Sequence, residues 1–155
     1  MPQEPLLINP FTQGPYIQAA TFCDMVIEGK DGTLSLIRLI DTLTHIEQGP
    51  NPPMEMPPVH KKLKLVLMIK AGRTQGRHQI KITPHLPNGE TKNSFEQSIN
   101  LDGEGSGHNT VIDFNFQYEL EGSYFFDVFF NEEMFTRIPL KVTYERFVTN
   151  FPKRP

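Results

Sequence analysis

The sequence has only one cysteine, Cys23, among its 155 residues. A single cysteine cannot form a disulfide within the chain, and no Asn-x-Ser/Thr acceptor for glycosylation occurs anywhere. The first residues also lack the basic start and the apolar run of a secretory signal. Together these absences lead us to expect a protein of the reducing cytoplasm.

Long apolar runs and an excess of positive charge are missing as well. The longest unbroken apolar run is Leu65–Ile69, whereas a helix needs about 20 such residues to cross a bilayer. The formal net charge of -3 and the pI near 5.9 are opposite to those of a surface that neutralises phosphates. We therefore expect no membrane span and no nucleic-acid partner.

What the sequence does contain is alternation. Apolar residues recur at every second position through most of the chain, which is the period of β-strands with one buried face. The clearest example places Leu63, Leu65, Leu67 and Ile69 on one face of a strand. We expect strands at about 16–27, 33–44, 63–69, 78–83, 93–101, 110–118, 123–130 and 137–144, and almost no helix. Arg38 interrupts the second of these and marks a bulge, an edge or an exception to the alternation.

Turn signals separate the expected strands. Residues 28–32 and the Asn88-Gly89 pair supply the left-handed conformations that tight hairpins need. Residues 48–58 hold five prolines and cannot form a helix or a central strand. We interpret this segment as a connector that crosses between two sheets, with a mobile partner-binding loop as the alternative. Seven or eight short strands with such turns predict a β-sandwich, with a closed barrel as the competing architecture.

Four short segments resemble a known family. Ala20–Val26 with Gly32–Leu36, and Gly122–Phe126 with Arg137–Val142, are similar to the opening and terminal hairpins of an uncharacterised bacterial family of immunoglobulin-like proteins. The resemblance covers residues 18–144. It implies an antiparallel immunoglobulin-like sandwich and no chemistry, because the activity of the family is unassigned.

The length suits a single domain over residues 1–155. We place its core at about 16–144 and expect loose tails at both ends.

Motifs for catalysis and for transition metals are absent from the sequence. The histidines lie in five different segments, without His-x-x-x-His or Cys-x-x-Cys spacing, and no Gly-x-Ser-x-Gly elbow occurs. Alternation places Cys23 on the same strand face as Ile17, Ala19 and Met25, which favours a buried small hydrophobe over a thiolate nucleophile. We expect no catalytic residue, no cofactor and no designed metal site.

The weak candidates for calcium are Asp31, Asp102 and Glu104, which lie in Gly-rich turns. Calcium takes six to eight oxygen ligands, and each of these turns offers only two carboxylates. Ordinary solvated loops are therefore the favoured interpretation.

These observations predict a non-enzymatic protein-interaction or structural module. Its partner is another protein or a second copy of the chain, bound by loops or by an exposed sheet edge near Pro84. The alternative is a small-ligand or calcium-binding β-sandwich domain that uses the Asp31 and Asp102 loops. An enzyme ranks third, because no reaction can be assigned to the residues present.

Overall fold

The computed structural model describes residues 10–150, which form one short helix and nine strands. The elements are α1 (Pro10–Gln13), β1 (Tyr16–Glu28), β2 (Leu34–Ile40), β3 (Thr42–Gly49), β4 (Val59–Lys70), β5 (Gln75–His85), β6 (Phe95–Asp102), β7 (Gly107–Tyr118), β8 (Gly122–Phe130) and β9 (Glu133–Val148). Among the described residues, no helix is both long and apolar enough to span a membrane. The all-β prediction is confirmed.

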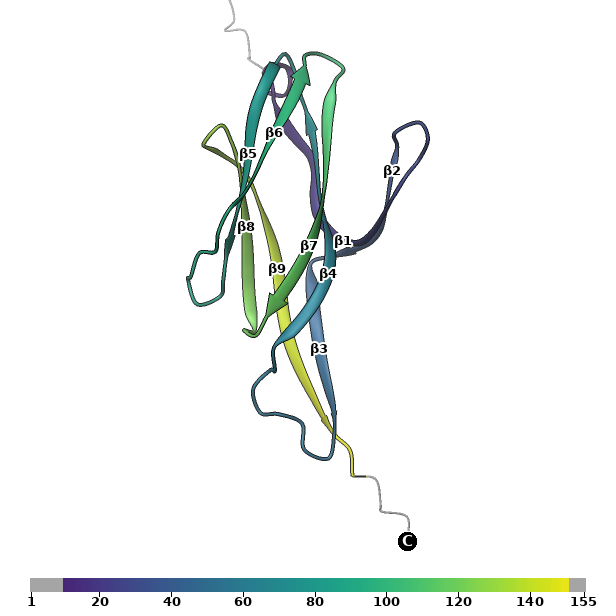
Figure 1. Ribbon diagram of the computed structural model, residues 1–155, viewed down its shortest axis with the longest axis vertical. Helices are drawn as coiled ribbons and strands as arrows, with labels where there is room; N and C mark the ends of the chain where they lie inside the picture. The colour runs from purple at the N-terminus through teal and green to yellow at the C-terminus, as the bar shows by residue number, and fades with distance from the viewer. Residues whose placement is uncertain (1–9, 151–155) are drawn as a thin grey trace, which may run out of the picture.

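The strands form two sheets that enclose one apolar core (Figure 1). The first sheet has the order β2-β1-β4-β7, and the second sheet has the order β3-β9-β8-β5-β6. Phe22 and Leu65 enter the core from the first sheet, while Phe126 and Leu140 enter it from the second. The edges of the two sheets are therefore β2 and β7, and β3 and β6.

The segment 33–44, expected as one strand, is two strands in different sheets. β2 pairs with β1 in the first sheet, and after Asp41 the chain continues as β3 beside β9 in the second. This division gives nine strands in place of the expected seven or eight. A change of sheet that takes a single residue leaves no turn signal in the sequence.

β3 and β9 run parallel, so the prediction of a wholly antiparallel arrangement is wrong at this pair. The remaining ladders between the described strands are antiparallel. β9 also continues to Val148, where it pairs with Gly49. The expected loose tail after residue 144 is therefore wrong as far as Val148. In the other tail, residues 10–13 form α1 and the Gln13 carbonyl accepts a hydrogen bond from the Arg73 backbone, while residues 1–9 and 151–155 lie outside the described residues.

A bulge in β1 overturns the expected facing of its residues. The register between β1 and β4 shifts between Ile17 and Ala19. Ile17 and Ala20 pack against the core and Phe22 lies in it, so Cys23 points to the opposite face. The simple alternation had placed Ile17 and Cys23 together, because one extra residue in a strand exchanges the two faces.

The Pro-rich connector crosses from the second sheet to the first, as expected, since it joins β3 to β4. The Tyr144 hydroxyl donates to the carbonyl of Pro53 at 2.7 Å, and Arg146 Nη2 donates to that of Pro52 at 2.9 Å. The connector is therefore anchored to β9.

Pro84 does not lie on a sheet edge, contrary to expectation. It belongs to β5, which runs between β8 and β6, and its register partner on β8 is Phe126. Pro84 is tolerated there because β6 pairs with β5 only as far as Ile82. Its carbonyl accepts a hydrogen bond from the Lys92 backbone instead.

Candidate functional site

Asp31 lies at the turn between β1 and β2 and holds that turn closed. Its Oδ1 accepts hydrogen bonds from the Thr33 backbone at 3.1 Å and from the Thr33 hydroxyl at 2.6 Å. These bonds lower the pKa of the exposed Asp31 carboxyl. The carboxylate thus has a local role in its own turn.

Asp102 is the last residue of β6, and Glu104 lies in the turn between β6 and β7. The Asp102 backbone donates to Ser106 Oγ, and the Glu104 carboxylate pairs with Arg73 at 3.2 Å. Among residues 10–150, no three His, Cys, Asp or Glu side chains are placed where they could hold one metal ion. The structure does not bring Asp31 together with Asp102 and Glu104 in such a group.

Cys23 is fully buried, which confirms the prediction of a buried small hydrophobe. Its thiol lies 3.5 Å from the Met25 carbonyl. Burial raises the pKa of this thiol, with a smaller lowering effect of the Met25 hydrogen bond. A buried thiol of raised pKa is poorly suited to act as a nucleophile.

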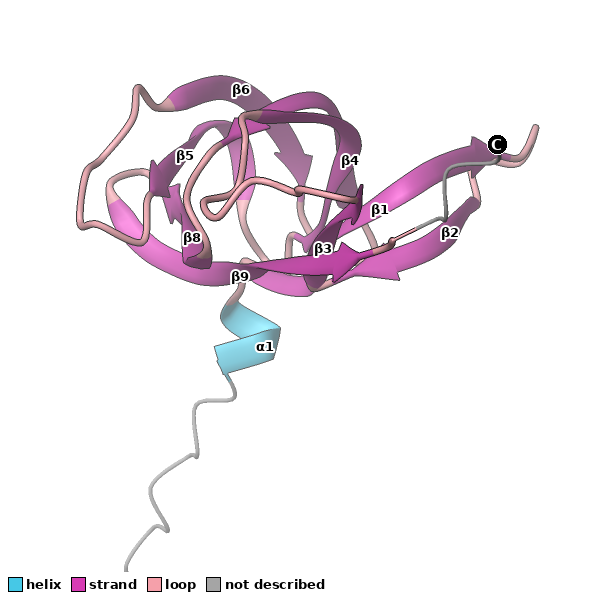
Figure 2. Cartoon of the chain, turned by 90° about the horizontal axis from the view of Figure 1, so that it is seen from below, coloured by secondary structure: helices cyan, strands magenta, loops and turns pink. Residues whose placement is uncertain are grey.

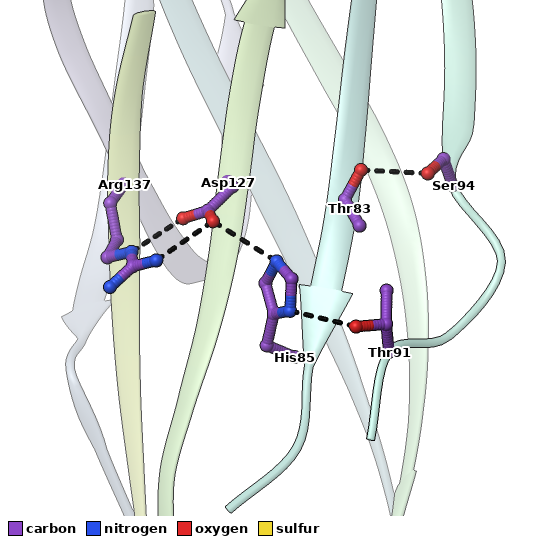
Figure 3. A network of polar contacts seen from close by, with 6 residues as sticks. All are labelled: Thr83, His85, Thr91, Ser94, Asp127 and Arg137. Atoms are coloured by element: carbon purple, nitrogen blue, oxygen red, sulfur yellow. Dashed lines mark hydrogen bonds and ion pairs between the residues drawn. The ribbon is translucent and has the colours of Figure 1, made fainter. Parts of the chain in front are cut away.

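The most connected group of polar side chains was not expected from the sequence. It lies on the outer side of the second sheet, around the buried carboxylate of Asp127 on β8 (Figure 3). Arg137 on β9 donates to this carboxylate twice, from Nε at 2.6 Å and from Nη2 at 2.9 Å. His85 Nε2 lies 3.1 Å from Asp127 Oδ2, and His85 Nδ1 lies 3.1 Å from the Thr91 hydroxyl.

This group, which we call the Asp127 network, has the order hydroxyl, imidazole and carboxylate. In a serine-protease relay the carboxylate stabilises the charge that forms on the imidazole. Here the Asp127 charge is already compensated by Arg137, whose guanidinium also lies 4.7 Å from the centre of the Phe125 ring. The hydrogen bonds from Arg137 lower the pKa of Asp127, against the opposing effect of burial. The geometry favours a structural clamp that joins β5, β8, β9 and the turn that holds Thr91.

The most unusual surface belongs to the β1–β2 arm, which we define as residues 24–39. β1 pairs with β4 only as far as Cys23, and beyond that point β1 and β2 leave the body as a two-stranded ribbon (Figures 1 and 2). Register pairs Met25 with Ile37 and Cys23 with Leu39, so these residues share one face of the ribbon.

That face of the arm is apolar and open to solvent. The exposed fractions are 54% for Met25, 51% for Ile27, 41% for Ile37 and 66% for Leu39. The opposite face carries further apolar side chains that are partly buried: Val26, Leu34 and Leu36. An exposed apolar cluster of this kind is characteristic of interaction surfaces.

Charged residues lie at both ends of the arm: Glu28, Lys30 and Asp31 at its tip, and Asp24 and Arg38 at its base. Arg38 Nη1 pairs with Asp24 Oδ2 at 3.1 Å, and Lys61 Nζ lies 3.9 Å from Asp24 Oδ1. Arg38 also has a φ of 55°, an uncommon conformation for a residue with a side chain. The interruption noted in the sequence therefore marks an edge strand with a local distortion, where the arm leaves the body.

The edge strand β2 differs from the other sheet edges in the described chain. Each of the other three edges exposes one large apolar residue, Val111 on β7, Phe95 on β6 and Ile46 on β3. Their other exposed positions are mainly polar: Asn109, Asp113, Asn115 and Gln117 on β7, Glu96, Ser98 and Asn100 on β6, and Thr42, Thr44 and Gln48 on β3. Polar and charged residues protect open edges against pairing with another chain. β2 exposes Ile37 and Leu39 in their place.

Sequence reasoning missed the arm because the alternation of 16–27 and 33–44 predicts strands without showing where β4 ends its pairing. A signal was present in the apolar residues on both faces of these segments. Apolar residues on both faces are found in strands that are buried on both sides, and also in exposed strands that bind another molecule.

The fold defines an all-β protein of two packed sheets. The chain belongs to a family of unknown function (DUF6941), whose model matches residues 18–143. This match confirms the family resemblance seen in the two hairpins.

Among solved structures, the chain is similar to an immunoglobulin-like protein (PA1606) from Pseudomonas aeruginosa. The identity is 13% and the TM-score 0.42, with 83% of this chain and 96% of that chain covered. No curated protein matches the sequence.

Proposed function

We propose that this chain is a non-enzymatic interaction module with an immunoglobulin-like sandwich arrangement, and that its β1–β2 arm binds a second copy of the chain. The observation that carries the proposal is the row of exposed apolar side chains on a ribbon that ends in the open edge of β2. A cytoplasmic location is part of the proposal, since Cys23 is a free thiol.

A second copy is the simplest occupant because one strand edge can pair with itself. Antiparallel pairing of two β2 strands about a two-fold axis satisfies the backbone groups of both edges and joins the two first sheets. Ile37 and Leu39 lie on one face of β2, where a symmetric pair brings these apolar residues together, while Leu36 and the charged Arg38 lie on the other face.

The size of the arm sets what the interface must include. The seven residues of β2 give an edge of about 23 Å at about 3.3 Å per residue. Stable interfaces bury about 800 Å² per partner, which is more than one strand edge supplies. The side chains of the arm faces must therefore be buried along with the edge, which is why Met25 and Leu39 matter to the proposal.

The proposal is tested by sedimentation equilibrium of the wild type and two variants over a wide concentration range. Leu39→Lys places a charge on the arm, and because a two-fold interface contains this position twice, we expect the dimer dissociation constant to rise by at least about tenfold. Ile46→Lys is the matched control, since Ile46 is 53% exposed on the edge strand β3. It should leave association unchanged.

Two results would count against the proposal. A wild type that stays monomeric at the highest concentration removes the second copy as partner. An equal loss of association in both variants places the interface away from the arm.

A further inference from the structure

A cavity of about 720 Å³ opens at the edge of the fold opposite to the arm. Its walls come from the second half of β7, the beginning of β4, the inward face of β8 and the turn that follows β5. β7 is the outer strand of the first sheet on the side away from β2. The volume lies within the range of sites for small organic ligands, about 300–1,000 Å³.

Aromatic rings line the inner part of this cavity. Phe114, Phe116 and Tyr118 alternate along β7, and Tyr124 and Phe126 alternate along β8. The rings of Phe116 and Tyr124 are perpendicular, with centres 5.0 Å apart, and those of Phe114 and Phe126 are perpendicular at 5.3 Å. These contacts hold the rings in fixed positions, so the apolar wall is preformed and suits a flat molecule.

The two tyrosines differ in their hydrogen bonding. The Tyr124 hydroxyl donates to the Leu120 carbonyl at 2.9 Å. Tyr118 is only 7% exposed, yet its hydroxyl has no hydrogen-bond partner among the described residues. The Tyr118 oxygen is not among the polar atoms sealed from solvent, and Tyr118 is one of the residues that line the cavity. A solvent-accessible hydroxyl in a largely buried side chain, with no protein partner, is free to donate a hydrogen bond to an acceptor on a ligand.

The charged groups at the rim favour a neutral ligand. Lys92 lies 4.0 Å from Glu90, which compensates its charge, and Glu119 adds a negative charge nearby. His60 also lines the rim. The lining thus offers no uncompensated positive charge for an anion, and its one carboxylate outside the Lys92–Glu90 pair, Glu119, is exposed to water at the rim and is not part of the aromatic wall.

We propose that this cavity binds a neutral, flat, mainly apolar organic molecule with one carbonyl-type acceptor, which receives a hydrogen bond from Tyr118. The buried rings form the floor of the site, the partly buried Val59, Leu86, Phe114 and Leu120 provide most of the contact, and the Tyr118 hydroxyl selects the acceptor. This site is independent of the arm, because β2 and β7 are opposite edges of the first sheet.

The test uses two probes of similar size in two-dimensional ¹H–¹⁵N NMR titrations of the whole chain. 2-Acetylnaphthalene carries the acceptor, and 2-ethylnaphthalene lacks it. In the wild type we expect shifts confined to the residues that line the cavity and a preference for the acetyl probe of about five- to tenfold. Tyr118→Phe keeps the ring and should abolish this preference while it leaves the ethyl probe unchanged.

A second pair of variants tests the place of binding. Leu86→Trp fills the cavity from the turn after β5 and should weaken both probes. Val111→Trp adds the same ring on β7 outside the cavity, where Val111 is exposed, and should weaken neither.

Three results would overturn the proposal: no binding of either probe to the wild type at the limit of solubility, shifts centred away from the cavity, or a preference that survives in Tyr118→Phe. If Leu86→Trp does not fold, the location of the shifts and the Tyr118→Phe comparison still decide the question.

Discussion

Asp127 interrupts the aromatic residues of β8 and is the buried carboxylate of the described chain. It stays ionised because Arg137 donates two hydrogen bonds to it, and His85 lies beside it. The charged form is thus favoured in the folded state, and the pKa of Asp127 lies below its ordinary value of 3.8. A lowered carboxyl pKa links folding to pH.

The linkage predicts how stability changes with acid. Asp127 contributes its full stabilisation above the unfolded pKa of about 3.8. This contribution decreases as the pH falls below that value and is lost once the pH passes the lower folded pKa. Asp127→Asn should reduce the free energy of unfolding at pH 7 by about 1–2 kcal/mol and flatten its decline in acid, as measured by urea denaturation at several pH values.

Asp113→Asn is the matched control, since Asp113 is an exposed carboxylate that pairs with Lys64 across two strands. Exposed pairs contribute little, so this variant should keep the wild-type stability and its acid dependence. An Asp127→Asn protein with the stability and pH profile of the wild type would refute the clamp.

At the scale of single residues, the sequence predicted some features of the structure and missed others. The burial of Cys23 was predicted, although its expected neighbours on the same strand face, Met25 and Ile27, are exposed. The pairing of Asp127 with Arg137 was within reach, because the expected final hairpin places opposite charges on adjacent strands. The contacts of His85 and Thr91 with this network could not be predicted, because both residues come from β5 and the turn after it, and no local sequence pattern indicates such contacts.

Two glycines mark the place where the start of the chain crosses the turn between β4 and β5. Gly72 has a φ of +58°, and a Cβ added there would lie 2.6 Å from Gly14 Cα and 2.7 Å from Gly14 N. The backbones approach so closely that only glycine fits. This contact attaches the segment before β1 to the body, together with the bond from the Arg73 backbone to the Gln13 carbonyl.

Gly72→Ala should therefore lower the free energy of unfolding by about 2–4 kcal/mol, from left-handed strain and steric overlap together. Gly105→Ala is the matched control, since Gly105 has a φ of +75° with nothing within 4 Å of an added Cβ. Gly105→Ala should lower the free energy of unfolding only by the left-handed backbone strain, about 1 kcal/mol. Equal losses in thermal or urea denaturation would show that the crossing contact has no role.

At the scale of elements, alternation located nearly all strands, and the Pro-rich connector was placed correctly between the sheets. The bulge after Ile17 and the change of sheet at Asp41 were not foreseen. Both involve a single residue, and neither alters the alternation enough to be seen in one sequence.

At the scale of the whole molecule, the two opposite edges of the first sheet have different surfaces, and we propose a different binding role for each. β2 is open, apolar and raised on an arm, while β7 borders a cavity lined by fixed aromatic rings. Composition and alternation were sufficient for the all-β class. They could not show which edge lacks protection, because this depends on which strand ends its sheet and on how far its neighbour extends.

The most direct test of the central claim, association through the arm, is amide hydrogen exchange of β2 at low and high protein concentration. In the monomer, the N–H groups of β2 that point away from β1 have no partner strand and should exchange rapidly. At concentrations where the protein is dimeric, the account predicts strong protection of these alternate amides between Leu34 and Ile40, with no comparable change in β3, β6 or β7. Unchanged rapid exchange in β2 while the protein is dimeric would contradict it.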